Sequence, residues 1–296
     1  MTLSTATELT ALAARHGLEL DASTMTLEEV GLDFRVGIAR TSTGETWVLR
    51  IPRRAGMDAQ IAAEGAILDF VAAQGIVAVP RWTIRSSELI AYRAVQGDPG
   101  LKIDAEGQLH WRLDPSSLRY AEAFGALLAK LHGVDVERAR EVGVEVEAPG
   151  EVRARWRRDI AKVSAEFSVA SELRERWQAW LDDDSYWPAW SVFSHGELYP
   201  AHVLIDAHET ITGVIDWSTA KVSDPARDFA FQRAMASAEA FEATLQAYAR
   251  AGGKPWPRLG EHAAELFAAS PVAYGLYALL TGEEKHRAAA QSALAG

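Results

Sequence analysis

Two neighbouring segments concentrate side chains that could carry out chemistry. The first, FSHGELYPAHVLID at residues 193–206, contains Glu197 and His202, and the second, ITGVIDWS, follows at once and adds Asp216. A carboxylate beside a hydroxyl can orient it and take its proton, and magnesium prefers a few oxygen ligands from a protein. Glu197 as base, with His202 and Asp216 as metal ligands, is therefore an arrangement typical of phosphoryl transfer.

Two other interpretations of the same segment stay open at this point. His195 and His202 could be ordinary core or surface histidines, which is what a single histidine usually is. The H-x-E-x-x-x-x-H spacing could also hold a hydrolytic metal, although the zinc-binding helix needs its two histidines at i and i+4. Other segments of the chain agree with phosphoryl transfer, and this agreement favours it over both alternatives.

The order of the motifs resembles that of the protein-kinase-like phosphotransferases. It is most similar to the macrolide 2′-phosphotransferase family of antibiotic kinases, whose loop reads H-G-D-L-x-x-x-x-V-L and whose second acid lies in an I-D-W tripeptide. The wider group has Asn where His202 stands, and the macrolide branch is similar to this chain in having His. DPARDF, at 224–229, resembles the D-P-x-x-D-F stretch that follows in the family. The loop and tripeptide match at His195, Gly196, Leu198, Val203, Leu204, Ile215, Asp216 and Trp217.

One position departs from the family pattern. Glu197 stands where the family has Asp as the base. The extra methylene moves the carboxylate by roughly 1 Å, and a misplacement of that size costs on the order of 10²-fold in rate. The departure therefore bears on how active the chain is.

A strand cation and a helix carboxylate form a second pair. ETWVLRIPR has strand character and contains Arg50, and MDAQIAAEGAIL has helix character and contains Glu64. In the kinase pattern such a strand cation grips donor phosphates and pairs with a helix Glu. Arginine suits phosphate because its planar fork donates two parallel hydrogen bonds. A surface arginine and an unrelated helix glutamate would give the same sequence.

Two further segments are expected to contact the nucleotide donor. GLDFRVG, at 31–37, stands where kinases have their glycine-rich loop, so the backbone around Phe34 and Arg35 would cover the phosphates. LIAYRAV, at 89–95, runs toward the expected linker, although a plain edge strand would look the same. Its candidate purine-binding backbone groups are those of Tyr92, Arg93, Ala94 and Val95.

The C-terminal helices are candidates for the acceptor pocket. DFAFQRAM and SPVAYGLYALL carry aromatic and apolar stripes, which are usually core. The resemblance implies that helices of this part form an apolar pocket for a macrolide lactone ring, with Phe231, Met235 and Tyr274 as candidate contacts. The target amino sugar would be cationic at neutral pH, and an acidic pocket would attract it.

The elements that must position these residues fall into two parts. Up to residue 95 the pattern predicts an antiparallel sheet with helices at 4–17 and 57–75, and strands at 26–30, 33–40, 45–52, 76–87 and 88–95. QGDPG marks a linker, and the rest predicts a HVLID–ITGVIDW hairpin among helices at 114–133, 151–167, 172–184 and from 224 onward. We therefore expect an α+β, bilobal, protein-kinase-like fold. Residues 1–95 form a small antiparallel β lobe for the nucleotide, and residues 96–296 form a larger, mainly helical lobe with the catalytic loop and substrate pocket.

The composition excludes several other classes of protein. The 296 residues carry 30 basic and 41 acidic side chains, a net charge of −11, which disfavours binding to nucleic acid. The absence of cysteine excludes disulfides and thiolate metal sites. No signal peptide and no apolar run of about 18–20 residues are evident, so we expect a cytoplasmic protein without a membrane partner. Without a coiled-coil pattern, a monomer is expected.

The sequence thus predicts a nucleoside-triphosphate-dependent phosphotransferase with an alcohol group as acceptor. The resemblance implies transfer of the γ-phosphoryl group of GTP (or ATP), with Mg²⁺, to the amino-sugar 2′-hydroxyl of a macrolide antibiotic, and hence resistance. His195 would shape the catalytic loop around the base. Two alternatives remain: a kinase for another acceptor, such as an aminoglycoside, choline or a sugar, and a catalytically weakened nucleotide-binding homologue in which Glu197 marks lost activity.

Overall fold

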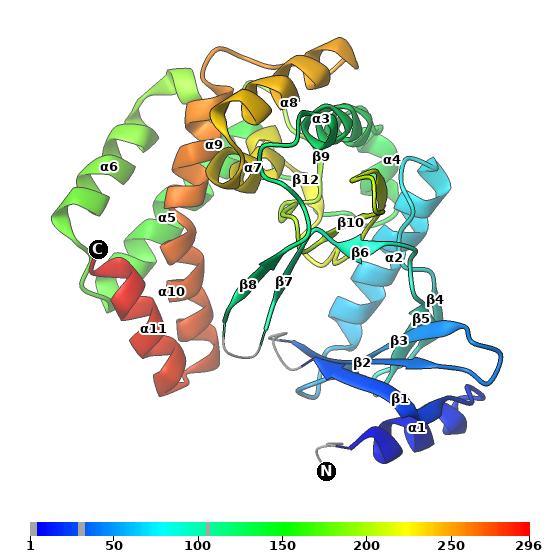
Figure 1. Ribbon diagram of the computed structural model, residues 1–296. Coiled ribbons are helices and arrows are strands. Elements are labelled where there is room, and N and C mark those ends of the chain that lie inside the picture. The colour runs from blue at the N-terminus through cyan, green and yellow to red at the C-terminus, as the bar shows by residue number, and fades with distance from the viewer. Residues whose placement is uncertain (1–4, 29–32, 105–106) are drawn as a thin grey trace. The chain divides into compact units, whose positions relative to one another are not determined.

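The computed structural model describes residues 5–28, 33–104 and 107–296 (Figure 1). Its internal contacts divide the chain into two compact units. The first unit comprises Met1–Ala123, Glu141–Val144 and Tyr199–Thr219, and the second comprises Phe124–Arg140, Glu145–Leu198 and Ala220–Gly296. The lobe boundary expected near residue 95 stays a prediction, because these units are defined by contacts and the chain passes between them several times.

A five-stranded antiparallel sheet forms the body of the first unit. The strand order is β1-β2-β3-β5-β4, so only β5 and β4 exchange places relative to the chain. The strands are β1 (Asp21–Glu28), β2 (Phe34–Arg40), β3 (Thr46–Pro52), β4 (Trp82–Arg85) and β5 (Ile90–Arg93). The predicted sheet is therefore confirmed, although residues 29–30 of the first expected strand lie outside the described residues.

One helix packs against each face of this sheet. On one face, α1 (Ala6–Arg15) buries Leu9 and Leu12 against Trp47 and Leu49 of β3. On the other, α2 (Asp58–Gln74) packs against β4, and a Cβ placed at Gly65 would lie 3.5 Å from the Trp82 ring, in ordinary van der Waals contact. The two helices expected from the sequence are thus present, and they bury the two faces of one sheet.

The ends of these helices follow ordinary capping chemistry. Thr5 accepts a hydrogen bond from the Glu8 N–H while the Glu8 carboxylate accepts one from the Thr5 N–H, which is a capping box. Gly75 ends α2 with φ of 65°, a left-handed conformation that favours glycine. Both boundaries were therefore readable from residue type.

The segment expected to be a linker, QGDPG at 96–100, contains one short strand. β6 (Asp98–Pro99) joins β10 (Val203–Ile205) and β11 (Ile211–Val214) in a three-stranded sheet of order β11-β10-β6. A hairpin of β7 (Leu101–Ile103) and β8 (Leu109–Trp111) follows β6. The β10–β11 hairpin was predicted. The strands at 98–111 were missed because two or three residues are too short to show an alternating pattern.

The next helix begins later than its sequence signals suggest. Asp114 and Pro115 were expected at its N-terminus, but α3 spans Leu118–His132. The Asp114 side chain accepts from the Ser116 N–H in a local turn, while the Asp114 N–H donates to the Glu209 carboxylate at 2.9 Å. A carboxylate that is distant in sequence therefore holds this turn open.

The second unit is mainly helical, with one two-stranded ladder between β9 and β12. In Figure 1, α5, α10 and α11 lie side by side, and α10 packs against both α5 and α11. The elements that complete the chain are α4 (Val136–Glu141), α5 (Pro149–Glu166), α6 (Ser171–Asp182), η1 (Asp184–Tyr186), β9 (Val192–Ser194), β12 (Lys221–Ser223), η2 (Pro225–Phe229), α7 (Ala230–Met235), α8 (Ala238–Arg250), α9 (Leu259–Ala268), α10 (Ser270–Thr281) and α11 (Glu284–Leu294).

One helical stretch of the described residues, Leu259–Thr281, is long and apolar enough to cross a membrane. The expectation that no stretch would approach this length was therefore wrong. The stretch is divided into α9 and α10 at Ala269, with Pro271 in the first turn of α10. Within α9, the side chain of His262 is fully buried and bonded to Asp224 at 2.7 Å, which is how a core helix of a folded unit is held.

The close contact of α3 with α8 makes a sharp test of this packing. A Cβ at Gly125 would lie 2.3 Å from the carbonyl oxygen of Thr244. Gly125→Ala should therefore lower the free energy of unfolding by about 1–3 kcal/mol, although alanine is the better helix former. Gly150→Ala in α5, where a Cβ meets nothing within 4 Å, is the matched control and should leave stability unchanged or higher. Urea unfolding of both variants decides the matter, and equal stabilities would contradict the packing.

Candidate active site

Arg50 and Glu64 form a buried ion pair in the first unit. Arg50 Nη1 donates to Glu64 Oε1 at 2.5 Å and Nη2 to Oε2 at 3.3 Å, so the pair is bidentate. The two side chains are 11% and 2% exposed. Burial opposes the charge of Arg50, but the facing Glu64 carboxylate outweighs it and raises the pKa of Arg50. β3 therefore presents a permanent cation that α2 orients, as the sequence predicted.

Two other residues predicted to contact the donor, Phe34 and Tyr92, lie near this pair, whereas Arg35 lies on the opposite face of the sheet. The Phe34 ring lies under the Arg50 guanidinium, 4.2 Å from the ring centre to Cζ. Tyr92 is paired across the sheet with Val48, and burial raises its pKa to about 12. Arg35 is paired with Ile51. Gly31 and Leu32 of the expected phosphate-covering segment lie outside the described residues.

The end of β5 borders a cavity of about 480 Å³. Three of the four predicted purine-binding residues, Arg93, Ala94 and Val95, are among the residues that line it. The Ala94 N–H donates to the Thr46 carbonyl at 2.9 Å, so this donor belongs to the sheet. A purine at this edge would therefore need other backbone groups of the segment for its hydrogen bonds.

His202 and Asp216 lie together at the start of β10 and just after β11. The Ile215 N–H donates to the His202 carbonyl at 2.9 Å, which extends the hairpin ladder and brings the two residues opposite each other. His202 Nε2 lies 3.6 Å from Asp216 Oδ2, and the side chains are 13% and 39% exposed. Asp216 has φ of 60°, a left-handed conformation that is uncommon outside glycine and recurs at functional sites.

The chemistry of these two side chains fits a magnesium ion in part. Magnesium is usually held by one or two carboxylates and keeps several waters, which suits the half-exposed Asp216. An imidazole nitrogen is a better ligand for transition metals, so His202 fits magnesium best through a bound water. Among residues 5–28, 33–104 and 107–296, no group of three or more His, Cys, Asp or Glu side chains is placed to hold a metal ion.

In the second unit, the buried carboxylate of Asp228 holds the loop that was predicted to be catalytic. Its Oδ2 accepts from the His195 N–H at 3.1 Å and its Oδ1 from the Gly196 N–H at 2.5 Å. His132 Nε2 lies 3.1 Å from the same Oδ2. Burial alone would raise the pKa of Asp228, but the hydrogen bond and charge of His132, with the loop N–H, hold that pKa below its usual value. Asp228 thus fixes the backbone next to Glu197.

His132 is itself oriented by Tyr248. The Tyr248 hydroxyl lies 2.9 Å from His132 Nδ1, and burial raises the pKa of Tyr248 to about 12. Whichever of Nδ1 and the hydroxyl donates, this contact holds the imidazole ring with Nε2 toward the Asp228 carboxylate. Neither His132 nor Tyr248 was predicted from the sequence, although Asp228 lies in the DPARDF segment.

Gly196 is required by its conformation and by its neighbour. Its φ is 87°, and a Cβ there would lie 2.1 Å from Arg227 Nη2. Arg227 Nη1 also donates to Ser194 Oγ at 2.8 Å. The Glu197 N–H donates in turn to His195 Nδ1 at 3.3 Å. The backbone before the predicted base is therefore held from several sides.

The predicted acceptor residues lie on two helices of the second unit. Phe231 and Met235 are one turn apart on α7, and Phe231 meets Phe267 of α9 edge to face, with ring centres 5.5 Å apart. Tyr274 lies on α10 and is 59% exposed. The structure thus brings Phe231 and Met235 together on one helix and has Tyr274 on another, and all three stay candidates.

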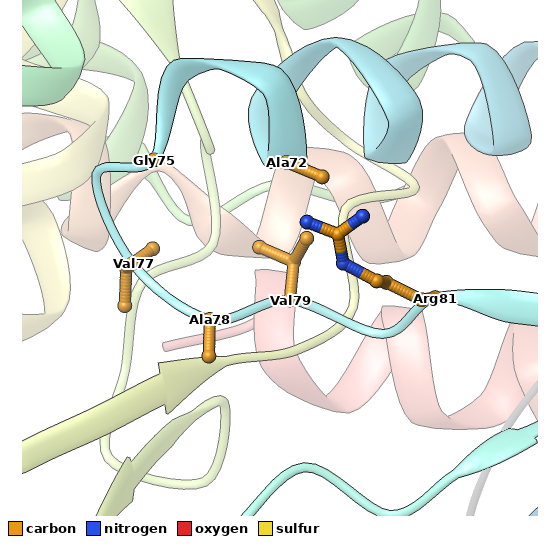
Figure 2. Close-up of a pocket in the computed structure, with 6 residues that line it drawn as sticks. All are labelled: Ala72, Gly75, Val77, Ala78, Val79 and Arg81. Atoms are coloured by element: carbon orange, nitrogen blue, oxygen red, sulfur yellow. The ribbon is translucent and has the colours of Figure 1, made fainter.

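A second cavity, of about 320 Å³, lies where α2 ends and the chain turns toward β4. Figure 2 shows small apolar side chains around it, with the Arg81 side chain extending beside Val79 toward Ala72. None of the predicted site residues lines this cavity, so it adds nothing to the predicted chemistry.

Comparison with known proteins identifies the family of the chain. Residues 27–262 match the phosphotransferase enzyme family known as APH. The chain belongs to this family. Its sequence and its structure therefore agree on an enzyme that transfers a phosphoryl group to a hydroxyl, as predicted.

The most informative relatives cover nearly the whole chain. The structure of the macrolide 2′-phosphotransferase MphH from Brachybacterium faecium is 53% identical, over 97% of this chain and 96% of its own, with a TM-score of 0.89. That of a type I macrolide 2′-phosphotransferase is 40% identical, over 100% and 99%, with a TM-score of 0.91. The uncharacterised protein YcbJ of Bacillus subtilis (strain 168) is 39% identical over 95% of this chain and 92% of its own. The predicted family resemblance is thus confirmed.

More distant structures support the fold. A GDP and kanamycin complex of APH(2″)-IIia is 19% identical, over 97% of this chain and 96% of its own, with a TM-score of 0.75. At this identity the likeness concerns the fold alone. The α+β, protein-kinase-like fold class predicted from the sequence is confirmed.

Asp228→Asn should be strongly destabilising in a pH-dependent way. The folded pKa of Asp228 is lowered, so its stabilising contribution is present above the unfolded value of about 3.9 and is lost as pH falls through the folded value. Near neutral pH the free energy of unfolding of Asp228→Asn should be about 3 kcal/mol lower than that of wild type. Urea unfolding from about pH 7 to about pH 3 should show the difference from wild type shrinking below about pH 4.

Asp182→Asn, which removes a half-exposed carboxylate paired with Arg157, is the control for a general loss of negative charge. It should change stability far less. A difference between wild type and Asp228→Asn that stays constant across the whole pH range would contradict the role assigned to the Asp228 charge.

Proposed function

We propose that the chain is a macrolide 2′-phosphotransferase that moves the γ-phosphoryl group of GTP, or of ATP, to the 2′-hydroxyl of a macrolide amino sugar. The observation that carries the proposal is 53% and 40% identity with two macrolide 2′-phosphotransferases over nearly the full length of each chain. The reaction would inactivate the antibiotic and so confer resistance, in a cytoplasmic monomer.

Each predicted residue has a defined task in this proposal. Glu197 orients the acceptor hydroxyl and takes its proton, on a backbone that Asp228 and Arg227 fix. Arg50 binds donor phosphate oxygens while Glu64 holds its guanidinium in one plane. Tyr92, Ala94 and Val95 border the donor purine, and the backbone of Phe34 and Arg35 covers the phosphates.

Asp216 would hold magnesium directly, with His202 as second ligand through its imidazole or through water. When bound, the ion neutralises charge on the donor phosphoryl oxygens. Ser218 Oγ donates to Asp216 Oδ1 at 2.7 Å, which leaves the Oδ2 side of the carboxylate facing His202. The side chains of Phe231, Met235 and Tyr274 would meet the apolar lactone ring.

Two other functions remain as outcomes of the same test. Another hydroxyl acceptor, such as an aminoglycoside, choline or a sugar, would fit the fold, which is shared with one structure of a GDP and kanamycin complex that is 19% identical to this chain. A weakened nucleotide-binding homologue would follow if the longer Glu197 side chain could not reach the hydroxyl. His202 favours the macrolide acceptor over the first of these.

The decisive experiment is turnover measured by mass spectrometry. The full chain is incubated with GTP or ATP, magnesium and a macrolide, and a product heavier by one phosphoryl group is expected. Glu197→Gln should lower kcat by 10²–10⁴-fold, since it keeps the shape but removes the base. Glu197→Asp should retain measurable turnover, and its rate relative to wild type reports the effect of the added methylene.

An acceptor panel of kanamycin, choline and a sugar alcohol provides the comparison. If one of these compounds is phosphorylated and macrolides are not, that compound takes the place of the macrolide as the proposed acceptor. Nucleotide binding without turnover in wild type, restored by Glu197→Asp, would identify the chain as a weakened homologue. Full activity of Glu197→Gln would show that Glu197 is not the base.

A further inference from the structure

The Arg50 guanidinium lies between two aromatic rings. Its Cζ atom is 4.2 Å from the centre of the Phe34 ring and 5.6 Å from the Trp82 ring. Phe34 is 5% exposed and Trp82 is 6% exposed. A cation over the face of a buried ring is attracted by the ring quadrupole, and the attraction is stronger where water is excluded.

The strand register explains why both rings reach Arg50. In the sheet, Arg50 is directly opposite Val36 on β2 and Ile90 on β5. Phe34 lies two residues from Val36, which is the diagonal position on the same face, within reach of a long side chain. Trp82, opposite Tyr92, lies on that face too. The sheet therefore places one ring on each side of the cation.

Trp82 also contacts the helix that carries the partner carboxylate. The ring lies 3.5 Å from the position of a Cβ at Gly65, the residue next to Glu64 on α2. Arg85 stands 5.8 Å from the same ring and pairs with Asp69 of α2 at 2.6 and 2.7 Å. The Trp82 indole therefore contacts both Arg50 on β3 and the helix α2 that carries Glu64.

The Trp82 indole is present despite an unmet hydrogen bond. Its Nε1 is buried and, within the described part of the chain, has no hydrogen-bond partner. A buried donor without a partner is unfavourable, so polar satisfaction does not explain this residue. The contacts of its ring with Arg50 and with α2 explain why a tryptophan stands at this position.

Arginine and lysine differ in how they would use such a site. A guanidinium is planar, stacks on ring faces and pairs with a carboxylate through two parallel hydrogen bonds. A lysine ammonium is a compact, strongly hydrated charge that would not fill the space between two rings. The surroundings of position 50 therefore match a guanidinium.

We propose that Phe34 and Trp82 are positioning residues that clamp the Arg50 guanidinium, and that this aromatic clamp makes position 50 require arginine and reject lysine. The inference rests on the proposed function, in which Arg50 binds the donor phosphates. The clamp keeps the guanidinium plane aligned with Glu64 while its remaining edge meets phosphate, so the clamp acts on the donor and not on the acceptor.

A double-mutant cycle tests the clamp in the full chain. Arg50→Lys should lower kcat/KM for the nucleotide by about 10²-fold in the wild-type background, and Phe34→Leu should lower it by about tenfold. In Phe34→Leu, the further change to lysine should have a much smaller effect, because the ring contact it removes is already lost. Phe34→Tyr keeps a ring and should restore most of the activity. Additive effects, or an active Arg50→Lys, would overturn the proposal.

Trp82→Leu and Trp47→Leu form a matched pair. Trp47 is 7% exposed, its Nε1 is likewise buried without a partner among the described residues, and Arg93 stands 5.8 Å from its ring. It lies on the opposite face of the same sheet, against α1. Both variants should lose stability, but only Trp82→Leu should raise KM for the nucleotide. An equal effect of both on KM would reduce Trp82 to a structural residue.

A spectroscopic readout separates this proposal from the proposed function. In ¹⁵N-labelled protein without ligands, the Arg50 Nε–H signal, assigned by its loss in Arg50→Lys, should be displaced by ring currents and should move toward the free-arginine position in Phe34→Leu. If the signal behaves so while no macrolide is phosphorylated, the clamp stands and the proposed function fails. If macrolide is phosphorylated but the signal does not move, the clamp fails alone.

Discussion

The burial of the Asp228 carboxylate is the constraint on which the second unit depends. A charged carboxylate is strongly disfavoured away from water unless hydrogen bonds replace its hydration. The backbone N–H groups of His195 and Gly196 and the imidazole of His132 replace it here. The same hydrogen bonds that keep Asp228 ionised also hold the backbone of His195 and Gly196 in one conformation.

The Asp228 carboxylate can hold the loop only if η2, the segment that carries it, is itself rigid. Contacts with the aromatic core make η2 rigid. Asp224 caps η2 by accepting from the Ala226 N–H at 2.8 Å, and His262 bonds to its other oxygen at 2.7 Å. Trp180 Nε1 donates to His262 Nδ1 at 2.9 Å. α6 and α9 therefore fix the start of η2, and η2 carries Asp228. In the first unit a buried charge is likewise paired, Arg50 with Glu64, whereas Asp216, the proposed magnesium ligand, is 39% exposed.

The sequence predicted those features that depend on neighbours along the chain. Helix α2 with Gly75 at its end, the β10–β11 hairpin, and the pairing of Arg50 with Glu64 could all be anticipated from local patterns and one motif. The His132–Asp228 contact spans 96 residues and the Glu209 contacts to the turn before α3 span more than 90, so no local pattern marks them. Phe34 was expected to act through its backbone. Its ring could be placed over Arg50 only once the register of β2 against β3 was known.

The same constraint bears on the glutamate that stands in place of the usual aspartate. Because Gly196 is held by its left-handed φ, by Asp228 and by the Arg227 side chain, the backbone before Glu197 cannot retreat to absorb an added methylene. The accommodation must then come from the side chain, which has one more rotatable bond than aspartate, or from the position of the acceptor hydroxyl. In the proposed reaction, a flexible Glu197 side chain on a rigid loop would weaken the orientation of the acceptor hydroxyl more than its binding, since orientation depends on where the carboxylate oxygens are held. If Glu197 acts as the proposed base, the rigidity of the loop is thus what makes position 197 sensitive to a single methylene.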